Sequence, residues 1–302
     1  MRELLSRAEL GESGKEGVLA LYRDDLSSVF PGMVRYLLRL EGTDRTVVLF
    51  STNTYEYPPL LPIDAERAAR QAAADWEAAI LAAPEGLVRP EGGPASPFLP
   101  PSPGGVLILQ GSPRPDGSCA VLAGWAAEAV AAAGRAVEVV FVHDLEVRPC
   151  IGCYQCYNTG DCTFDDDMTR LAPAIRAASL LVVCSPVYTN TVPAGLKAVI
   201  DRAQALHAEE ALAVHGPAAA RQTGVLLATA GRRGLENFGC VQSVVRAFMA
   251  NLGIRFRGEV LVDDLDARRD LRGIPDLELR VGSTVLAALP ASGASSSSGL
   301  RP

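Results

Sequence analysis

The most constraining feature of this sequence is a regular alternation of short apolar runs with longer alanine-rich or amphipathic segments in its C-terminal part. The apolar runs predict five strands, at residues 106–109, 137–142, 180–184, 225–230 and 256–262. The segments between and after them predict five helices, at residues 118–133, 167–178, 193–206, 236–252 and 277–289. Apolar strands that alternate with helices form a parallel sheet covered on both faces, with right-handed crossovers. The expected fold class is α/β, with a doubly wound five-stranded parallel sheet.

The N-terminal part has a different pattern, which predicts a small α+β unit over residues 1–83. Apolar alternation predicts three strands, at residues 17–23, 34–40 and 46–51. Asp64 is placed to cap a helix that runs to about residue 82. The role of this unit is not apparent from its sequence.

The two parts are separated by residues 84–105, which are rich in proline and glycine. Such a stretch forms neither a helix nor a central strand, so we interpret it as a linker. The second domain then covers residues 106–289, and the serine-rich residues 290–302 predict a disordered tail. Pro173 lies inside a predicted helix and should kink or restart it.

The amino-acid composition and net charge exclude some classes of function. The chain has 302 residues, of which 48% are hydrophobic and 21% charged, as in a soluble globular protein. Its net charge of −7 offers no electrostatic basis for binding nucleic acid or an anionic membrane. We find neither a signal peptide nor an apolar run near the roughly 20 residues of a membrane-spanning helix. We therefore expect a cytoplasmic protein, whose clustered cysteines indicate metal or redox chemistry rather than disulfides.

Four of the seven cysteines, Cys150, Cys153, Cys156 and Cys162, follow one another with the spacing C-x2-C-x2-C-x5-C. Thiolates this crowded repel one another, and a metal ion or cluster would neutralise them. The last spacing, which contains Gly160, lets the chain fold back onto the same site. Structural zinc more often uses two cysteine pairs a dozen or more residues apart. An iron–sulfur cluster, a zinc ion and metal-free thiols all remain open from the residues alone.

The loop after the first predicted strand, residues 110–118, suits a phosphate monoester. Gly111 lets the backbone turn, and Ser112 and Ser118 supply hydroxyl groups. The helix that follows directs its free N–H groups and the positive end of its dipole at this loop. The loop lacks the G-x-G-x-x-G pattern of dinucleotide sites. The alternative interpretation is an ordinary turn rich in glycine and serine.

Two further motifs follow the third predicted strand: S-P-V-Y at residues 185–188, and G-L-K-x-x-I-D-R at residues 195–202. Together with G-S-P-R-x-x-G-S at residues 111–118, they resemble the NADPH-dependent FMN reductase branch of the flavodoxin-like superfamily. The cysteine spacing and the downstream residues 165–168 resemble the iron–sulfur flavoproteins within that branch. The resemblance covers about residues 104–290. It implies the strand order 2-1-3-4-5, with ligands at the carboxyl ends of the strands.

The resemblance also implies roles for individual residues. The FMN phosphate would be held by the loop that contains Gly111, Ser112, Arg114, Gly117 and Ser118. The isoalloxazine ring would be lined by Ser185, Pro186, Val187 and Tyr188, with backbone amides facing its polar edge, and closed by Ala230, Gly231 and Arg232. The four clustered cysteines would hold a 4Fe-4S cluster. The cysteine segment follows the second strand at the same sheet edge, which predicts that it lies near the flavin.

Other polar residues receive more ordinary interpretations. Tyr188 is alternatively a partly buried tyrosine, and Arg232 and Arg233 either attract a nucleotide phosphate or lie in a solvated loop. Lys197, Asp201 and Arg202 are interpreted as helix and interface charges rather than catalysts. Cys119, Cys184 and Cys240 are expected to be small buried residues. No protein group is predicted to be catalytic, because His143, His207 and His215 lie outside these loops and the flavin N5 carries the chemistry.

The leading hypothesis is an FMN-dependent oxidoreductase with a 4Fe-4S cluster. It would pass electrons from NAD(P)H or a ferredoxin to a quinone, an oxygen species or another small-molecule or protein acceptor. The resemblance implies a homodimer or homotetramer. One alternative is a cluster-free NAD(P)H:FMN or quinone reductase. Another is a redox sensor whose cysteines or flavin report to a partner through the N-terminal unit.

Overall fold

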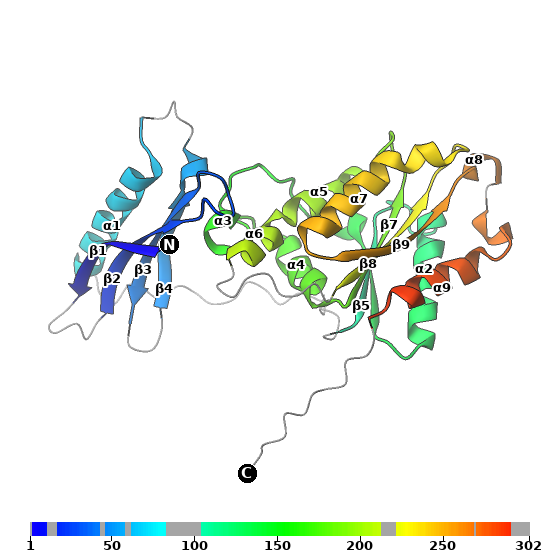
Figure 1. Ribbon diagram of the computed structural model, residues 1–302, viewed down its shortest axis with the longest axis horizontal. Coiled ribbons are helices and arrows are strands. Elements are labelled where there is room, and N and C mark those ends of the chain that lie inside the picture. Colours follow the sequence, from blue (N-terminus) through cyan, green and yellow to red (C-terminus); the bar gives the residue numbers. More distant parts are fainter. Residues whose placement is uncertain are drawn as a thin grey trace, which may run out of the picture. The chain divides into compact units, whose positions relative to one another are not determined.

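The structure is a computed structural model that describes residues 2–10, 17–42, 46–57, 62–82, 104–212, 222–268 and 270–290 (Figure 1). Nearly all of the predicted tail and of the predicted linker, together with His215, lie outside the described residues. The chain divides into two compact units. The first comprises Met1–Pro97, Cys150–Phe164 and Gln204–Gly216, and the second comprises Phe98–Pro149, Asp165–Ala203 and Pro217–Pro302. Two segments that follow the linker in sequence therefore pack with the N-terminal residues.

The first unit contains an antiparallel sheet of four strands in the order β1-β2-β3-β4. These strands are β1 (Arg2–Leu10), β2 (Gly17–Asp25), β3 (Val34–Glu41) and β4 (Thr46–Asn53). The last three and the helix α1 (Ala65–Ala82) lie where the sequence predicts them. The edge strand β1 was not predicted, because most of its residues are polar and exposed and carry no strong apolar alternation.

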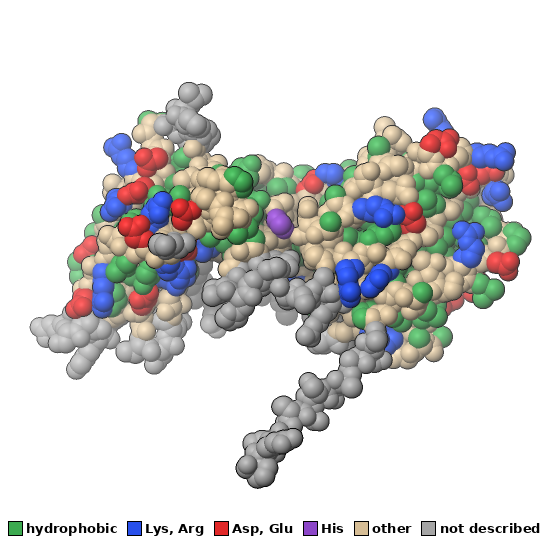
Figure 2. All heavy atoms as spheres, in the orientation of Figure 1, with side chains coloured by type: hydrophobic (Ala, Val, Ile, Leu, Met, Phe, Trp, Pro, Cys, Tyr) green, Lys and Arg blue, Asp and Glu red, His purple; other side chains and the backbone are tan. Residues whose placement is uncertain are grey.

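Helix α1 packs on this sheet around a small core. Asp64 caps the helix as predicted, with its Oδ1 accepting a hydrogen bond from the backbone N of Arg67 at 2.8 Å. The core consists of Leu10, Leu19, Leu21, Tyr36, Leu38, Ala65, Ala69 and Ile80. Acidic and basic side chains intermingle on the surface of this unit (Figure 2). Arg2 donates to the buried Asp24 at 2.8 Å.

The second unit contains a five-stranded parallel sheet in the order β6-β5-β7-β8-β9. Its strands are β5 (Val106–Gln110), β6 (Val137–Phe141), β7 (Leu180–Pro186), β8 (Thr223–Thr229) and β9 (Arg255–Val262). In order along the sequence this is 2-1-3-4-5, so the predicted flavodoxin-like topology is confirmed. The central strands β5 and β8 are buried along their whole length, because they are apolar on both faces and covered on both.

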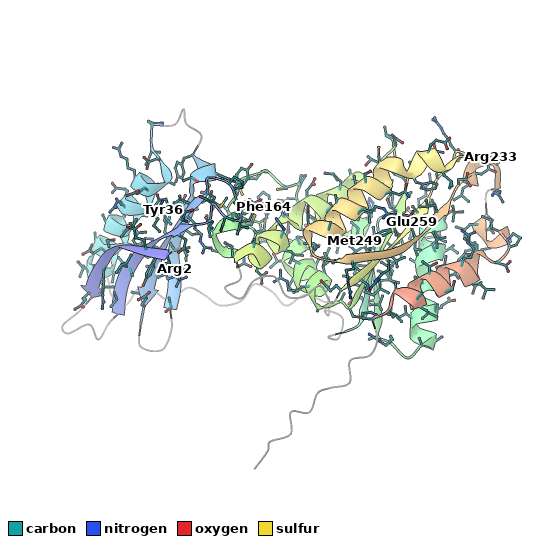
Figure 3. All side chains as sticks on the ribbon, in the orientation of Figure 1. Arg2, Tyr36, Phe164, Arg233, Met249 and Glu259 are labelled. Atoms are coloured by element: carbon teal, nitrogen blue, oxygen red, sulfur yellow. The ribbon has the colours of Figure 1, made fainter. Side chains whose placement is uncertain are left out.

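Helices cover the two faces of this sheet. Helices α2 (Ser118–Ala132) and α9 (Leu277–Ala288) share one apolar core with β5, β7, β8 and β9. Helices α5 (Ala194–Arg202) and α7 (Gly239–Asn251) lie on the opposite side in Figure 1. Met249 of α7 faces the sheet (Figure 3), and its sulfur lies 2.3 Å from where a Cβ at Gly224 would be. Glycine at this position therefore lets α7 pack closely on β8.

Three local predictions need adjustment. Helix α4 (Met168–Ala177) runs through Pro173 without a break. The helix predicted over residues 193–206 is two helices, because α5 ends at Arg202 and α6 (Gln204–Leu212) begins two residues later and belongs to the first unit. The short helices α3 (Cys156–Thr159) and α8 (Leu265–Arg268) were not predicted.

Among the described residues, no helix has the length and apolarity that crossing a membrane requires.

Candidate functional site

The loop between β5 and α2 has the shape that the sequence predicts for a phosphate site. The backbone N of Gly111 donates to the carbonyl of Cys184 at 2.8 Å, which brings the loop against β7. A Cβ at Gly111 would lie 2.6 Å from the Cδ2 of Leu196, so only glycine fits here. The loop also closes on itself, because Arg114 N donates to Ser112 Oγ at 3.2 Å.

Helix α2 begins at Ser118 directly after this loop. Its N-cap is Gly117, which has no side chain to cap the first turn. The free N–H groups of that turn and the positive end of the helix dipole therefore face the loop. Ser118 is partly buried there and Arg114 is exposed. An anion with several oxygen atoms fits this arrangement of N–H donors, hydroxyl groups and one cation.

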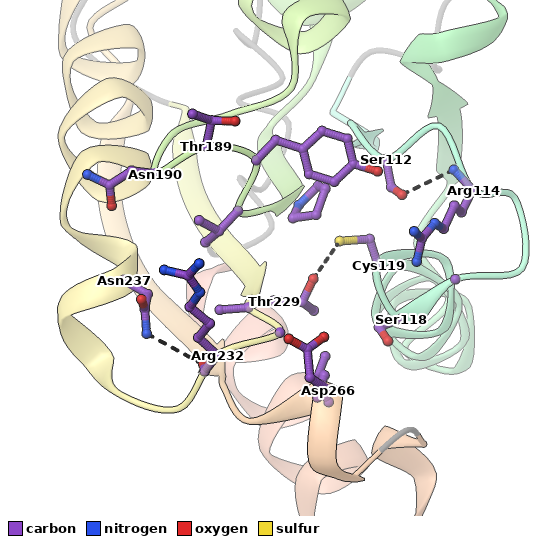
Figure 4. Close-up of a pocket in the computed structure, with 17 residues that line it drawn as sticks. Ser112, Arg114, Ser118, Cys119, Thr189, Asn190, Thr229, Arg232, Asn237 and Asp266 are labelled. Carbon is purple, nitrogen blue, oxygen red and sulfur yellow. Dashed lines mark hydrogen bonds between the residues drawn. The ribbon is translucent and has the colours of Figure 1, made fainter.

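A cavity of about 790 Å³ opens next to this loop, at the carboxyl ends of β5, β7, β8 and β9 (Figure 4). In Figure 4, Ser112 and Arg114 lie on one side of the cavity, and Asn190 and Asn237 lie on the other. The residues that line it are Ser112, Arg114, Gly117, Ser118, Cys119, Pro186, Val187, Tyr188, Thr189, Asn190, Thr229, Ala230, Gly231, Arg232, Asn237, Leu265 and Asp266.

The structure thus brings together all but two of the predicted cofactor-binding residues. The exceptions are Gly111 and Ser185, which are buried behind the lining. Ser185 directs its hydroxyl to the carbonyl of Pro186 at 3.0 Å. Both residues therefore shape the loops rather than line the cavity.

The loop after β7 forms a tight turn beside the cavity. Thr189 and Asn190 both have positive φ angles, of 45° and 66°, and Tyr188 and Thr191 exchange backbone hydrogen bonds. The backbone N of Val187 donates to Thr229 and that of Tyr188 to Thr191, both at 2.8 Å. These two amides are already bonded within the protein, whereas the resemblance implied that they face a flavin edge. The Tyr188 side chain is 39% exposed at the rim of the cavity.

The loop after β8 is held by the segment that follows β9. Leu265 N donates to Ala230 O at 3.2 Å, and Asp266 N donates to Gly231 O at 2.9 Å. A Cβ at Gly231 would lie 2.4 Å from the Asp266 carboxylate, so the two segments approach closely. Asp266 and Leu265 line the cavity but were not predicted. They follow the fifth strand at the same sheet edge, which is the signal that would have located them.

Cys119 and Thr229 form an uncharged floor of the cavity. Cys119 lies within hydrogen-bonding distance of Thr229, with 3.2 Å between its sulfur and the threonine hydroxyl. Burial raises the pKa of Cys119 to about 12, so this thiol is neutral. Cys119 and Cys184 are buried as predicted, but Cys240 is exposed. It lies near the start of α7, where its sulfur accepts a hydrogen bond from Asn190 at 3.4 Å.

The four clustered cysteines lie in the first unit. Helix α3 ends at Thr159, and its C-cap Gly160 has a φ of 89°, a left-handed conformation that glycine adopts readily. A Cβ at Gly160 would lie 2.7 Å from the Cβ of Glu209 in α6, so glycine also allows the two helices to pack. Cys150 is exposed, and Cys153, Cys156 and Cys162 are partly buried.

The pKa of Cys156 is affected by the other cysteines of this segment. Burial is the main cause that raises the pKa of its thiol to about 12, and the neighbouring Cys162, Cys153 and Cys150 raise it further. The other three cysteines are therefore close enough to Cys156 to disfavour ionisation of its thiol. Four such thiols become thiolates together only if a positive centre compensates them, which fits a metal or a cluster. Within the described ranges, however, no three side chains of His, Cys, Asp or Glu form a group suited to a single metal ion.

Comparison with known proteins identifies the family. Residues 105–263 match the NADPH-dependent FMN reductases, and this match covers more than half of the chain. The chain belongs to the NADPH-dependent FMN reductase family. The resemblance inferred from the loop motifs is thereby confirmed, and the N-terminal residues lie outside the match.

Two relatives with similar sequences are named iron-sulfur flavoproteins. The chain is 37% identical over 101 residues to an iron-sulfur flavoprotein of Methanocaldococcus jannaschii, covering 33% of this chain and 52% of that protein. It is 38% identical over 94 residues to an iron-sulfur flavoprotein of Methanosarcina thermophila, covering 31% and 49%. The chain thus spans about half the length of the curated relatives it matches.

Solved structures with a related shape have low sequence identity. One is an NADH:FMN oxidoreductase (EMOB) in its apo form, with a TM-score of 0.45 and 18% identity, covering 62% of this chain and 90% of that chain. Another is an FMN-dependent NADH-azoreductase of Bacillus anthracis in complex with FMN, with a TM-score of 0.46 and 12% identity, covering 60% and 98%.

The residues of this FMN reductase family member fit the family's cofactor. One end of the cavity offers the uncapped start of α2 with Ser112, Arg114 and Ser118, which suits a phosphate. Pro186, Val187 and Tyr188 offer an apolar wall beside it. The cavity volume of about 790 Å³ lies within the range of cofactor sites.

Proposed function

We propose that this protein is an FMN-dependent oxidoreductase that carries a 4Fe-4S cluster on Cys150, Cys153, Cys156 and Cys162. It takes electrons from NAD(P)H or a ferredoxin and passes them to a quinone, an oxygen species or another acceptor. The observation that carries the proposal is the cavity at the carboxyl edge of the parallel sheet, with the uncapped start of α2 at one end. We further propose a cytoplasmic homodimer or homotetramer.

The residues of the cavity bind and orient rather than transfer protons. When bound, FMN supplies hydride acceptance at its N5 atom and onward electron transfer. Ser112, Ser118 and Arg114 hold the phosphate end, and the first turn of α2 contributes N–H donors. The neutral Cys119 and Thr229 form an uncharged floor. Tyr188 covers the rim, and Arg232 offers a cation for the phosphate of an incoming nucleotide.

The cysteine segment supplies the second redox centre in this proposal. Its support is the presence of four cysteines in one short stretch, of which three lie close enough to affect Cys156, and the iron-sulfur flavoproteins among the relatives. Four cysteine thiolates are the usual ligands of a 4Fe-4S cluster. A flavin can accept two electrons as a hydride and release them singly, whereas a cluster carries one electron at a time. The two centres would together couple a two-electron donor to a one-electron acceptor.

A cluster-free reductase is the second candidate. It is favoured by the finding that no compact group of three metal-binding side chains occurs in the part of the chain that the structure describes. This candidate retains the flavin chemistry and leaves the cysteines as thiols.

Anaerobic purification followed by chemical analysis distinguishes the two. The leading proposal expects one FMN with about four iron and four sulfide per chain, and menadione-dependent oxidation of NADPH or NADH. FMN with turnover but neither iron nor sulfide supports the cluster-free reductase. A protein that takes up no FMN when it is supplied in excess contradicts both.

A further inference from the structure

The N-terminal sheet contacts the cysteine segment through a network of buried polar side chains, all within the first unit. Asn53, the last residue of β4, is fully buried. Its Nδ2 donates to the side-chain oxygen of Asn158 at 2.8 Å and to the backbone carbonyl of Tyr154 at 3.1 Å. Tyr154 follows Cys153 directly, and Asn158 lies two residues after Cys156. Asn53 therefore bonds to the chain on either side of Cys156.

Glu56, three residues after Asn53, extends the same network. Its Oε1 accepts hydrogen bonds from the side chain of Asn158 at 2.9 Å and from the backbone N of Asn53 at 3.0 Å. Its Oε2 accepts a hydrogen bond from the side chain of Gln155. Both oxygens of one carboxylate thus bind residues of the cysteine segment, and the capping box of Asn53 and Glu56 fixes their orientation.

Arg35 on β3 supplies the third connection. Its Nη1 donates to the backbone carbonyl of Asn158 at 2.6 Å, and its Nη2 donates to Asp24 at 2.7 Å. The side chains of Arg35 and Asp24 are almost completely buried. As a result, the carbonyl, the side-chain oxygen and the side-chain nitrogen of Asn158 each bond to a residue of the N-terminal unit.

Aromatic rings reinforce this contact. Phe30 packs edge-on against Tyr157 with ring centres 4.3 Å apart, and Tyr55 packs edge-on against Tyr154 at 5.4 Å. The rings of Tyr154 and Tyr157 stack on each other at 5.7 Å. The rings that flank Cys156 are therefore held by residues of the N-terminal unit.

We propose that the N-terminal unit, residues 1–83, positions the cysteine segment, an inference that rests on the proposed function. In this arrangement Asn53 holds the backbone around Cys153 and Cys156 in the conformation that accepts the cluster. Buried polar groups that lose their partners are costly, so the segment has one strongly favoured arrangement while the network is intact. Residues that orient metal ligands without touching the metal typically contribute 10- to 100-fold to metal affinity. The inference assigns a role to the part of the chain that lies outside the family match.

The test uses the full-length protein with Asn53→Ala and a matched control, Tyr22→Phe. Tyr22 donates to Glu41 at 2.7 Å within the same sheet, so the control removes one hydrogen bond there. We expect Asn53→Ala to release iron to a chelator about ten-fold faster than wild type and to shift the midpoint potential of the cluster. Its FMN content should match that of wild type. Tyr22→Phe should retain iron, and circular dichroism should show that both variants are folded.

A second measurement keeps the inference testable if the protein carries no cluster. In reduced, metal-free protein, iodoacetamide labelling followed by mass spectrometry reports the accessibility of each thiol. We expect Cys156 to react about ten-fold faster in Asn53→Ala than in wild type. The exposed Cys240 should react equally in both and serves as the reference.

The outcomes separate this inference from the proposed function. If wild-type protein contains neither iron nor sulfide, the proposed cluster is wrong. The rate of iodoacetamide labelling at Cys156 then decides whether Asn53 positions the segment. Unchanged iron release and unchanged labelling in Asn53→Ala overturn the positioning role. Equal iron loss in Asn53→Ala and Tyr22→Phe also overturns it, because general weakening of the sheet then accounts for both.

Discussion

Arg202 and Asp166 form a buried ion pair that joins the two ends of the cysteine segment. The guanidinium donates to both carboxylate oxygens, at 2.6 and 2.9 Å, and also to the backbone carbonyl of Arg148 at 2.8 Å. The two side chains are 1% and 5% exposed. Because Arg148 precedes Cys150 and Asp166 follows Cys162, this pair fixes the points where the segment leaves and rejoins the second unit.

We expect Asp166→Asn to lower the free energy of unfolding by about 3 kcal/mol, because it removes the negative charge that the buried guanidinium of Arg202 binds through two hydrogen bonds. The control is Asp201→Asn, which removes an exposed ion pair with Lys197 and should cost about 0.5 kcal/mol or less. Urea unfolding followed by circular dichroism measures both. Similar decreases in the free energy of unfolding of the two variants would show that the buried ion pair stabilises the protein no more than the exposed one.

The contribution of Asp166 should depend on pH. Burial disfavours ionisation of its carboxyl group, but hydrogen bonds from Arg202 and from the backbone of Arg148 and Met168 outweigh this effect and lower its pKa below 3.8. A lowered pKa in the folded state contributes stability above the unfolded pKa, and that stability disappears as pH falls through the folded value. The difference in unfolding free energy between wild type and Asp166→Asn should be constant from about pH 5 to 7 and shrink below about pH 4. A difference that grows in acid contradicts this assignment.

Cys153→Ala should remove most of the iron and leave the FMN in place. One missing thiolate leaves a cluster iron without its protein ligand, whereas the flavin cavity is lined by other residues. Cys240→Ala is the control, since Cys240 is exposed and lies outside the segment. Iron and flavin content after anaerobic purification are the measurements. Iron retained in full by Cys153→Ala means that this thiol is not a ligand.

Ser112→Asp should purify with little FMN, because it places a negative charge beside the expected phosphate. Ser112 is buried in the loop before α2, where its hydroxyl accepts a hydrogen bond from Arg114 N. Ser283→Asp, on the exposed face of α9, introduces the same charge elsewhere and should retain full flavin. Flavin absorbance per chain measures the effect. Equal flavin in the two variants places the phosphate elsewhere.

Gly111→Ala should weaken FMN binding at least ten-fold and lower stability by about 1–3 kcal/mol, as overpacking does. Its new methyl group would lie 2.6 Å from Leu196 Cδ2 and 3.1 Å from the carbonyl of Cys184, so the loop must shift. Gly124→Ala, in the middle of α2, has nothing within 4 Å of its new methyl group and should be neutral or slightly stabilising. Fluorescence titration with FMN and thermal unfolding test both variants. Wild-type affinity in Gly111→Ala would show that the loop need not lie against β7.

Several features of the site were predictable because they depend on short stretches of sequence. The glycine and serine pattern at residues 111–118 indicates a turn before a helix wherever it occurs, and the uncapped start of α2 follows from Gly117. Cys240 was harder to place, because one cysteine in an amphipathic helix carries no signal of which side it faces. Asp266 and Leu265 were missed because their position on the cavity depends on how the end of β9 packs on the loop after β8.

The sequence by itself determined a doubly wound parallel sheet, because apolar strands alternating with helices leave few topologies that bury both faces. The strand order followed from the resemblance of the loop motifs to a known family. The sequence also determined which loops meet at the carboxyl edge, since every parallel strand ends there. Only the tertiary structure decided that the cysteine segment and α6 pack with the N-terminal sheet. Asn53 and Asn158 are 105 residues apart, and the amide groups that bond them give no local pattern in the sequence. Periodicity records which face of an element is buried, whereas the choice of polar partner depends on three-dimensional proximity.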